Sequence, residues 1–449
     1  MRKRKRRRRR FRLRRRRKRA RSRRRKTRKR KRTRLRRRKK RRRSRRRRTK
    51  KRKRRFRRRR RSKRRSRRRK RRSVKRKRKR PKRRKSSKRS ERAISIGIEL
   101  ETYTISIPDY RISRELHYPR RGIAELGEKF KRDLSIGNEY NSRVFFTIRE
   151  AFFLLKNGLR KYIHYRPSSA SRERVTLFPI GGWTDRFAGM HIHVALGKKK
   201  FDYARSRSLA RKLHDHIPFI IALTGNSPVW RERINQINSN RLLLGTKKYC
   251  QLTRREAFSK LRYRELTFNA GGMRKPPTLE LRVPDSGVPE YIAAAACVVK
   301  AVALAWLKRR PVMNQLSYQD YLLARDRAVH YGPQARLFWN HHAVTVSQYV
   351  DLFFRKYEDE LKQMEIPSEV VDIFKYLKKE WNQATVIRRA AQKSRWLHRP
   401  TWERRFAKRY ATAIERLLDG NSYSDFARTL GIRLPHIKRV WLGRKEAKW

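Results

Sequence analysis

Two glutamates stand two residues apart in the segment GIELE at residues 97–101. In an extended strand, side chains two residues apart point to the same face, so the carboxylates of Glu99 and Glu101 would lie side by side. Neighbouring carboxylates repel each other unless a positive charge lies between them, and a divalent cation is the simplest such charge. The alternative is a solvated face of an antiparallel strand, and the motif by itself favours that second interpretation.

Two histidines repeat this spacing in the segment GMHIHV at residues 189–194. His191 and His193 would share one face of a strand, and the apolar residues between them would share the other. A single buried histidine is usually satisfied by a neighbouring hydrogen-bonding group. Two histidines on the same face of an apolar strand indicate a ligand site, for a metal ion or a phosphate.

A glutamate and an arginine show the same alternation in the segment TLELRVPD at residues 278–285. Glu280 and Arg282 would therefore project from one face, where they could form nothing more than an ion pair. Next to a metal ion and a nucleotide, however, the guanidinium of Arg282 would bind phosphoryl oxygens through paired hydrogen bonds.

A further acid lies in the polar segment DLSIGNEYNS at residues 133–142. Glu139 is a candidate third acid of the same site. The alternative is a turn that precedes a helix, with Ser142 as the N-cap residue.

The same periodicities indicate the elements that must position these residues. Alternation predicts strands at residues 93–107, 189–196 and 278–283, and apolar residues at helical spacing predict helices at residues 144–163, 203–223, 289–309, 318–329, 346–364 and 368–381. The most apolar stretch, residues 293–307, is too short to span a membrane and contains Lys300, so it predicts a buried core helix. Strands among helices, followed by helices alone, predict an α+β core with a helical tail.

Taken in order, the four polar segments resemble the glutamine synthetase-fold ligases. Glutamine synthetase has a GMH-x-H strand and an E-x-R-x-P-D strand that leads into an alanine-rich helix, while GIELE and DLSIGNEYNS look more like the amidoligase and type 2 glutamate–cysteine ligase branches. The resemblance covers residues 93–310. It implies a curved antiparallel sheet with helices and an ATP-dependent ligase that uses Mg²⁺ or Mn²⁺. Such a ligase joins a carboxylate substrate, which could be glutamate-like, to an amine through an acyl phosphate.

The resemblance also implies roles for individual residues. Four residues match the metal ligands of the family, namely Glu99, Glu101, His191 and Glu280. His193 and Arg282 match groups near the nucleotide phosphates, and Glu139 matches the next acid, so that Arg282 and Glu139 are the implied catalytic residues. The segment NSNR at residues 238–241 resembles the substrate- and phosphate-binding arginine loop, which makes Arg241 a candidate nucleotide ligand.

The positive charge of the chain is concentrated at its beginning. The 449 residues carry a formal net charge of +103 at pH 7, and residues 1–92 hold 72 Lys and Arg against one acid, Glu91. This segment has too few apolar residues to bury a core, and its like charges repel, so a disordered arm is predicted. Such an arm binds polyanions, and DNA or RNA is the expected partner. An anionic membrane surface and a general solubilising or import tail are the alternatives.

The remaining composition is typical of an intracellular protein. The only cysteines are Cys250 and Cys297, which form neither a disulfide framework nor a metal cluster motif and suit a reducing compartment. No apolar run follows the basic start, so a secretory signal is not expected. The predicted location is therefore cytoplasmic or nucleic-acid-associated, with no membrane span.

The end of the chain shows a second pattern. Within residues 424–444, Ala427, Gly431 and Ile437 fall at the spacing of the small, turn and core positions of a helix-turn-helix, and Pro435 could open its second helix. Four polar residues would then face outward: Arg433, His436, Lys438 and Arg439. Residues 383–449 hold 17 Lys and Arg against 5 acids, so residues 401–449 are a second candidate nucleic-acid contact. The alternative is a helical cap packed on the ligase domain.

Two functions of different classes follow from three predicted parts, residues 1–92, 93–382 and 383–449. The first is an active ligase tethered to nucleic acid, which is favoured because charged residues on an inner face are costly in a scaffold without activity. The second is a nucleic-acid packaging or architectural protein with an inactive ligase-like domain, which the arm favours. The sequence leaves open the acid, the amine and the oligomeric state, a homo-oligomer included.

Overall fold

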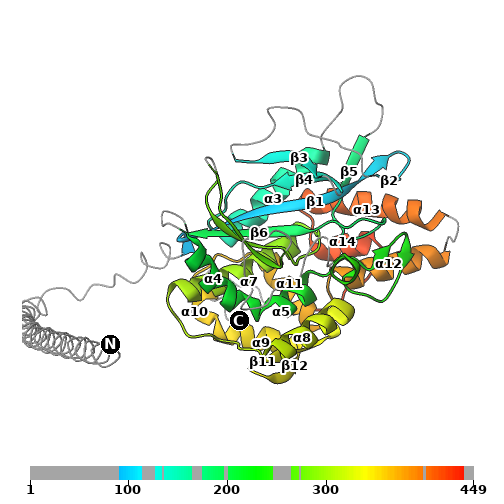
Figure 1. The fold of residues 1–449 in the computed structure, drawn as a ribbon. Coiled ribbons are helices and arrows are strands. Elements are labelled where there is room, and N and C mark those ends of the chain that lie inside the picture. Colours follow the sequence, from blue (N-terminus) through cyan, green and yellow to red (C-terminus); the bar gives the residue numbers. More distant parts are fainter. Residues whose placement is uncertain are drawn as a thin grey trace, which may run out of the picture. The chain divides into compact units, whose positions relative to one another are not determined.

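The computed structural model describes residues 91–113, 127–133, 136–163, 174–196, 201–245, 264–272, 275–397 and 401–438 (Figure 1). The predicted arm lies outside these residues except at its last two positions. The division of the chain at residues 92 and 382 therefore stays a prediction.

An antiparallel sheet forms the framework of the described residues. Its strands are β1 (Ile94–Ile107), β2 (Ile112–Ser113), β3 (Lys129–Asp133), β4 (Gly137–Asn141), β5 (Arg174–Phe178), β6 (Met190–Leu196), β9 (Leu266–Asn269) and β10 (Thr278–Leu281). They lie in the order β3-β4-β1-β6-β10-β9, while β2 and β5 pair with the far part of β1. Two small hairpins stand apart from this sheet: β7 (Val229–Trp230) with β8 (Arg233–Ile234), and β11 (Arg336–Trp339) with β12 (His342–Thr345).

The register of the sheet aligns the polar residues of separate segments. Glu99 on β1 lies opposite His191 on β6, and Glu280 on β10 lies opposite His193. The apolar residues between them, such as Ile98 and Leu100, are buried. The predicted alternation is therefore present, and pairing of the strands places its polar positions in adjoining rows.

The helices pack against the sheet and against one another. They are α3 (Ile148–Ile163), α4 (Tyr203–His214), α5 (Ile217–Thr224), α6 (Asn240–Leu244), α7 (Pro289–Leu307), α8 (Tyr318–Tyr331), α9 (Val346–Lys356), α10 (Glu358–Leu361), α11 (Ser368–Lys378), α12 (Gln383–Leu397), α13 (Trp402–Leu418) and α14 (Tyr423–Thr429). Together with the sheet they confirm a mixed helix and antiparallel-sheet fold.

Helix α7 is the central helix of the described structure. It packs against β1, β6, α3, α4, α5, α10 and α11, and its alanines allow this close approach. It is long and apolar enough to cross a membrane, but 89% of its apolar window is buried inside the protein, as the prediction of a core helix requires. Its single lysine, Lys300, donates hydrogen bonds to the carbonyls of Ile94 (3.0 Å) and Phe146 (2.6 Å). The charge therefore ties α7 to the start of β1.

Two predicted helices are divided in the structure. The helix predicted at residues 203–223 ends at His214, and α5 begins again at Ile217 with Pro218 in its first turn. Because proline has no backbone N–H and its ring clashes with the preceding turn, a continuous helix would be broken at this point. The helix predicted at residues 346–364 is likewise interrupted at Tyr357, between α9 and α10.

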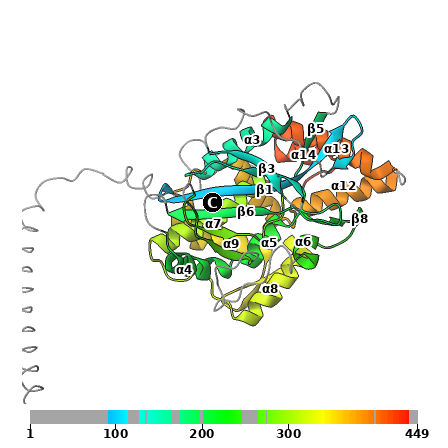
Figure 2. The same cartoon turned by 45° about the horizontal axis from the view of Figure 1, so that its top comes forward.

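The tail packs on the sheet through aromatic side chains. Tyr410 of α13 meets Phe178 of β5 edge to face at 4.6 Å between ring centroids, and Phe406 stacks on Trp183 at 5.3 Å. Figure 2 shows α13 beside β5 at one end of the sheet. This arrangement is that of the alternative interpretation, a helical cap on the domain.

The second helix of the predicted helix-turn-helix is absent from residues 431–438. Gly431 ends the α14 turn with a φ of +80°, and the chain then has no regular structure up to Lys438. Arg439 and the rest of the predicted recognition helix lie outside the described residues.

Candidate active site

Three strands bring one possible metal ligand each to a single point. Glu99, His191 and Glu280 each offer a ligand atom, and these three atoms lie within 4.8 Å of one another. The His191 Nδ1 atom is 3.5 Å from an oxygen of Glu99 and 3.5 Å from an oxygen of Glu280. Ligand atoms bound at about 2.1 Å to one cation are separated by about 3–4 Å, so this spacing suits a divalent ion.

The second glutamate of β1 lies on the other side of His191. Glu101 Oε1 is 3.9 Å from His191 Nε2, and its Oε2 accepts a hydrogen bond of 2.6 Å from the Gly189 backbone N–H. The His191 Nε2 atom is buried and makes no hydrogen bond. A buried ring nitrogen without a hydrogen bond and close to one carboxylate is a donor that a metal ion could satisfy, while Glu99 and Glu280 lie at the other ring nitrogen.

His193 and Arg282 border this group of ligands. The His193 Nε2 atom lies 3.4 Å from Glu99 Oε2, and its Nδ1 is 3.0 Å from the Thr278 hydroxyl. Arg282 pairs through its guanidinium with Glu280 Oε1. One cationic side chain thus stands directly beside a candidate metal ligand, as a phosphate-binding group must.

The protonation states follow from these contacts. Burial acts to raise the pKa of Glu99, but His191 and His193 outweigh it and hold that pKa well below its usual range. Burial, aided by Arg282, lowers the pKa of His191 to about 4. Glu99 is therefore ionised and His191 neutral at pH 7, which are the forms that bind metal.

Glu139 lies on a strand, so the alternative of a helix-preceding turn is wrong. It stands on β4 opposite Glu101, and its Oε1 contacts Lys131 Nζ at 2.6 Å and Asn141 Nδ2 at 2.8 Å. Burial and the nearby charge of Glu99 raise the pKa of Glu139. Ser142 is not an N-cap; its hydroxyl accepts the Ile98 backbone N–H at 2.9 Å.

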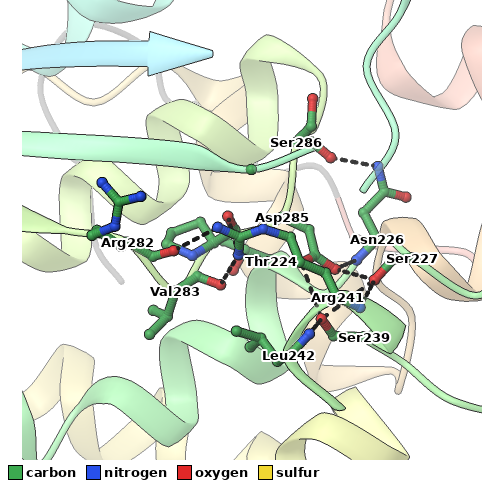
Figure 3. Close-up of polar contacts among 12 residues, drawn as sticks. Thr224, Asn226, Ser227, Ser239, Arg241, Leu242, Arg282, Val283, Asp285 and Ser286 are labelled. Atoms are coloured by element: carbon green, nitrogen blue, oxygen red, sulfur yellow. Dashed lines mark hydrogen bonds and ion pairs between the residues drawn. The ribbon is translucent and has the colours of Figure 1, made fainter. Parts of the chain in front are cut away.

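Arg241, the predicted nucleotide ligand, is buried and bound to backbone carbonyls, and its role toward a nucleotide stays a prediction. Its side chain is 2% exposed. Its guanidinium donates to the backbone carbonyls of Arg282 (3.0 Å), Val283 (3.3 Å) and Pro284 (3.3 Å) (Figure 3). These donors are engaged with the protein itself. The NSNR motif correctly marked a polar segment near the site but not the depth at which its arginine lies.

Sequence reasoning missed three residues that hold the site together. Asp285 is buried behind β10, Gly189 precedes the histidine strand, and Lys131 pairs with Glu139. The signal for Asp285 was its place directly after the strand motif TLELRV and a proline. An aspartate buried at such a place requires hydrogen-bonding partners. For Lys131 no signal existed, since a lysine in a charged segment is ordinarily solvated.

The comparisons with known proteins agree with the motifs. No family model matches the chain. A curated relative, a putative glutamate–cysteine ligase 2-3 of Rubrobacter xylanophilus, is 30% identical over 180 residues, which cover 35% of this chain and 47% of the relative. The chain thus spans about half the length of this relative. The match confirms the resemblance to glutamine synthetase-fold ligases that the ordered motifs indicate.

Several solved structures are similar at low identity. The ligase PafA in complex with the prokaryotic ubiquitin-like protein Pup has a TM-score of 0.49 and 12% identity, covering 76% of this chain and 81% of that chain. A bifunctional glutathione synthetase from Pasteurella multocida has a TM-score of 0.49 and 11% identity, covering 76% and 56%. A glutamate–cysteine ligase from Francisella tularensis in complex with AMP has a TM-score of 0.46 and 12% identity, covering 76% and 92%.

Proposed function

We propose that residues 93–382 form an ATP-dependent carboxylate–amine ligase that uses Mg²⁺ or Mn²⁺. The observation that carries this proposal is the convergence of Glu99, His191 and Glu280 from three strands, with Arg282 paired to Glu280. The glutamate–cysteine ligase relative supports the same reaction class. By that relative's name, glutamate and cysteine are the first acid and amine to test.

In this proposal the residues of the chain bind and orient two anions. A bound divalent ion would supply charge neutralisation for the phosphates, held by Glu99, Glu101, His191 and Glu280. Arg282 and His193 would contact the transferring phosphoryl group, which carries its negative charge on three oxygens. Such preorganised charges stabilise the transition state more than the bound substrate.

The chemistry proceeds in two balanced steps. An oxygen of the substrate carboxylate attacks the γ-phosphorus of ATP, ADP leaves, and an acyl phosphate forms. The amine nitrogen then attacks the acyl carbon, inorganic phosphate leaves, and the nitrogen loses a proton. We assign this proton to Glu139, because burial and Glu99 raise its pKa and so make its carboxylate a better base.

The basic arm supports a second part of the proposal, that nucleic acid tethers the enzyme. Residues 1–92 carry 72 basic side chains and a single acid, so they would neutralise many phosphates at once. Residues 401–449 remain a weaker candidate contact. The competing function is a packaging or architectural protein whose ligase-like domain is inactive.

Ligand-induced stabilisation separates the two functions. The full-length protein should be stabilised by Mg-ATP by about 2.7 kcal/mol at 100 times the dissociation constant, as measured in thermal or urea melts. Glu280→Gln should abolish this gain, because it removes a ligand from the candidate metal position. ADP release with glutamate and cysteine then tests turnover.

A matched control uses a buried glutamate outside the site. Glu360 is fully buried and pairs with Lys308 (2.9 Å) and Arg310 (2.6 Å). Glu360→Gln should lower the melting temperature yet keep the Mg-ATP gain. A wild-type protein that gains no stability from Mg-ATP would refute the ligase and leave the packaging function.

A further inference from the structure

A buried polar cluster lies at the end of β10 and contributes no ligand to the proposed chemistry. At its centre is Asp285, which is 2% exposed. Its Oδ2 accepts the backbone N–H of Asn226 and the hydroxyl of Ser227, both at 2.8 Å, and its Oδ1 accepts the hydroxyl of Ser239 at 3.0 Å (Figure 3). One carboxylate therefore joins the segments before and after the β7–β8 hairpin to the end of β10.

Arg241 completes this cluster on the side of the site. Its guanidinium lies 3.7 Å from the Asp285 carboxylate and donates to three consecutive carbonyls, those of residues 282–284. In Figure 3 the Arg282 carbonyl faces Arg241, while the Arg282 guanidinium points away from the cluster. The backbone from which Arg282 projects is thus held by a second arginine. A guanidinium suits this task because its donors form a rigid planar fork.

Gly189 connects the same guanidinium to the other strands of the site. A Cβ at this position would lie 2.3 Å from a terminal nitrogen of Arg241, so a larger residue would displace this guanidinium. The Gly189 N–H donates to the Glu101 carboxylate (2.6 Å), and its carbonyl accepts the Glu101 N–H (3.0 Å). Gly189 also lies two residues before His191 on β6. The Arg241 guanidinium therefore packs against the backbone at the start of β6, next to the hydrogen bonds that join Gly189 to Glu101.

We propose that Arg241 and Asp285 are positioning residues, which fix the backbone at Arg282 and Gly189 and thereby set the directions of Arg282, Glu101 and His191. This inference rests on the proposed function and deepens it. It assigns Arg241 to the support of the metal ligands instead of to the nucleotide. A direct contact with phosphate would require the ligand to reach a guanidinium whose side chain is only 2% exposed.

Two conservative variants separate positioning from charge. Arg241→Lys keeps the positive charge, but one ammonium cannot replace a planar fork that serves three carbonyls. Asp285→Asn keeps the size, but its amide nitrogen would face a donor of Asn226, Ser227 or Ser239. Glu360→Gln is the control, since it perturbs a buried carboxylate that pairs with two partly exposed cations, Lys308 and Arg310, just after α7.

The first measurement needs no ligand. Hydrogen exchange of the full-length protein, followed by mass spectrometry, should show at least tenfold faster exchange in peptides that cover residues 186–193 and 281–286 of Arg241→Lys. The Glu360→Gln control should leave these peptides unchanged. The second measurement is Mn²⁺ affinity by calorimetry. Arg241→Lys and Asp285→Asn should each weaken it by about 10- to 100-fold, as for other groups that support metal ligands, while the control stays within about twofold of wild type.

The outcomes distinguish this inference from the proposed function. A raised KM for ATP in Arg241→Lys, with unchanged exchange and Mn²⁺ affinity, would show direct nucleotide contact and overturn positioning. Equal losses of Mn²⁺ affinity in all three variants would show general destabilisation and overturn it as well. If wild type binds no Mn²⁺ but the exchange result is as expected, positioning stands and the ligase fails. Should Arg241→Lys not fold, Ser239→Ala removes one donor to Asp285 and carries the same test with a smaller effect.

Discussion

His191 is the residue at which the candidate site converges, because it stands within 3.9 Å of carboxylate oxygens from Glu99, Glu101 and Glu280. Burial keeps its pKa at about 4, so its ring is neutral at pH 7 although three acids surround it. A neutral imidazole adds no positive charge to these acids, and among them Glu280 is paired with Arg282. Three carboxylates around one neutral ring are the physical reason to expect a cation at this point.

Arg282 provides a test of roles at the residue scale. Arg282→Ala should keep Mn²⁺ binding, because the three converging ligands remain, but it should lose phosphoryl transfer by about two to three orders of magnitude. The measurement is ADP release beside Mn²⁺ calorimetry. Arg282→Ala that binds no Mn²⁺, or that keeps its ADP release, would contradict the role of a phosphate-contacting residue.

The direction of individual side chains was predictable where the residues follow a local alternating pattern. Alternation alone placed Glu99 and Glu101 on one face and His191 and His193 on one face. That the two glutamates and the two histidines lie together depends on pairing between strands about 90 residues apart in the sequence. Local periodicity contains no information about that pairing. The motif at residues 238–241 indicated nucleotide chemistry for Arg241, and that role stays a prediction, because local sequence contains no information about how deeply its side chain is buried.

At the scale of elements, helix α5 begins at a buried histidine. His216 precedes Ile217, and its two ring nitrogens contact the hydroxyls of Tyr349 (2.7 Å) and Tyr357 (2.9 Å). These tyrosines come from α9 and the residue after it. The histidine therefore links α5 to α9 within the core.

This histidine predicts an acid-dependent stability. Burial lowers the pKa of His216 to about 4, while the unfolded value is about 6.5. As the pH falls from about 6.5 to 4, the unfolded state takes up a proton that the folded state does not, so the free energy of unfolding falls. Between pH 7.5 and pH 5 the share of this loss due to His216 should be roughly 2 kcal/mol.

Urea melts across this range measure the effect. His216→Gln should be less stable at pH 7.5, yet its stability should decline by roughly 2 kcal/mol less than that of wild type toward pH 5. His342→Gln, on the exposed strand β12, should follow the wild-type curve. Parallel curves for wild type and His216→Gln would show that another group causes any acid sensitivity.

Elements were predictable in proportion to their apolar periodicity. Strand β1, helix α3 and helix α7 have a clear pattern and were expected close to their observed bounds. Strands β3 and β4 were missed because charged and polar residues alternate there without an apolar face of sufficient length. The second helix of the tail is absent from residues 431–438, and its remainder lies outside the described residues, while the aromatic contacts of α13 show that the tail packs on the domain.

At the scale of the whole molecule, the chain combines two segments of very different net charge. The arm holds most of the net charge of +103, and the remainder contains nearly all of the acids. Nucleic-acid affinity of the full chain should therefore fall steeply with salt. Each phosphate neutralised contributes about −0.9 to the slope of log affinity against log salt.

Deletion of residues 1–90 tests this division. Fluorescence anisotropy with duplex DNA and with RNA should show a shallow salt slope after deletion and a steep one before it, with no dependence on base sequence. The truncated protein should keep a cooperative melt and its Mg-ATP gain. Loss of that melt would mean that the arm takes part in the fold and that the predicted boundary is wrong.

The aromatic contact between α13 and β5 has a consequence for how the protein is made. Phe178 and Trp183 are synthesised early, but Phe406 and Tyr410, which cover them, leave the ribosome only after more than 200 further residues. Until then the nascent sheet has an uncovered aromatic surface of the kind that chaperones bind and that promotes aggregation. The core is thus completed only in the last part of translation. A chain whose synthesis ends before residue 400 lacks the helix α13 that covers these aromatic side chains.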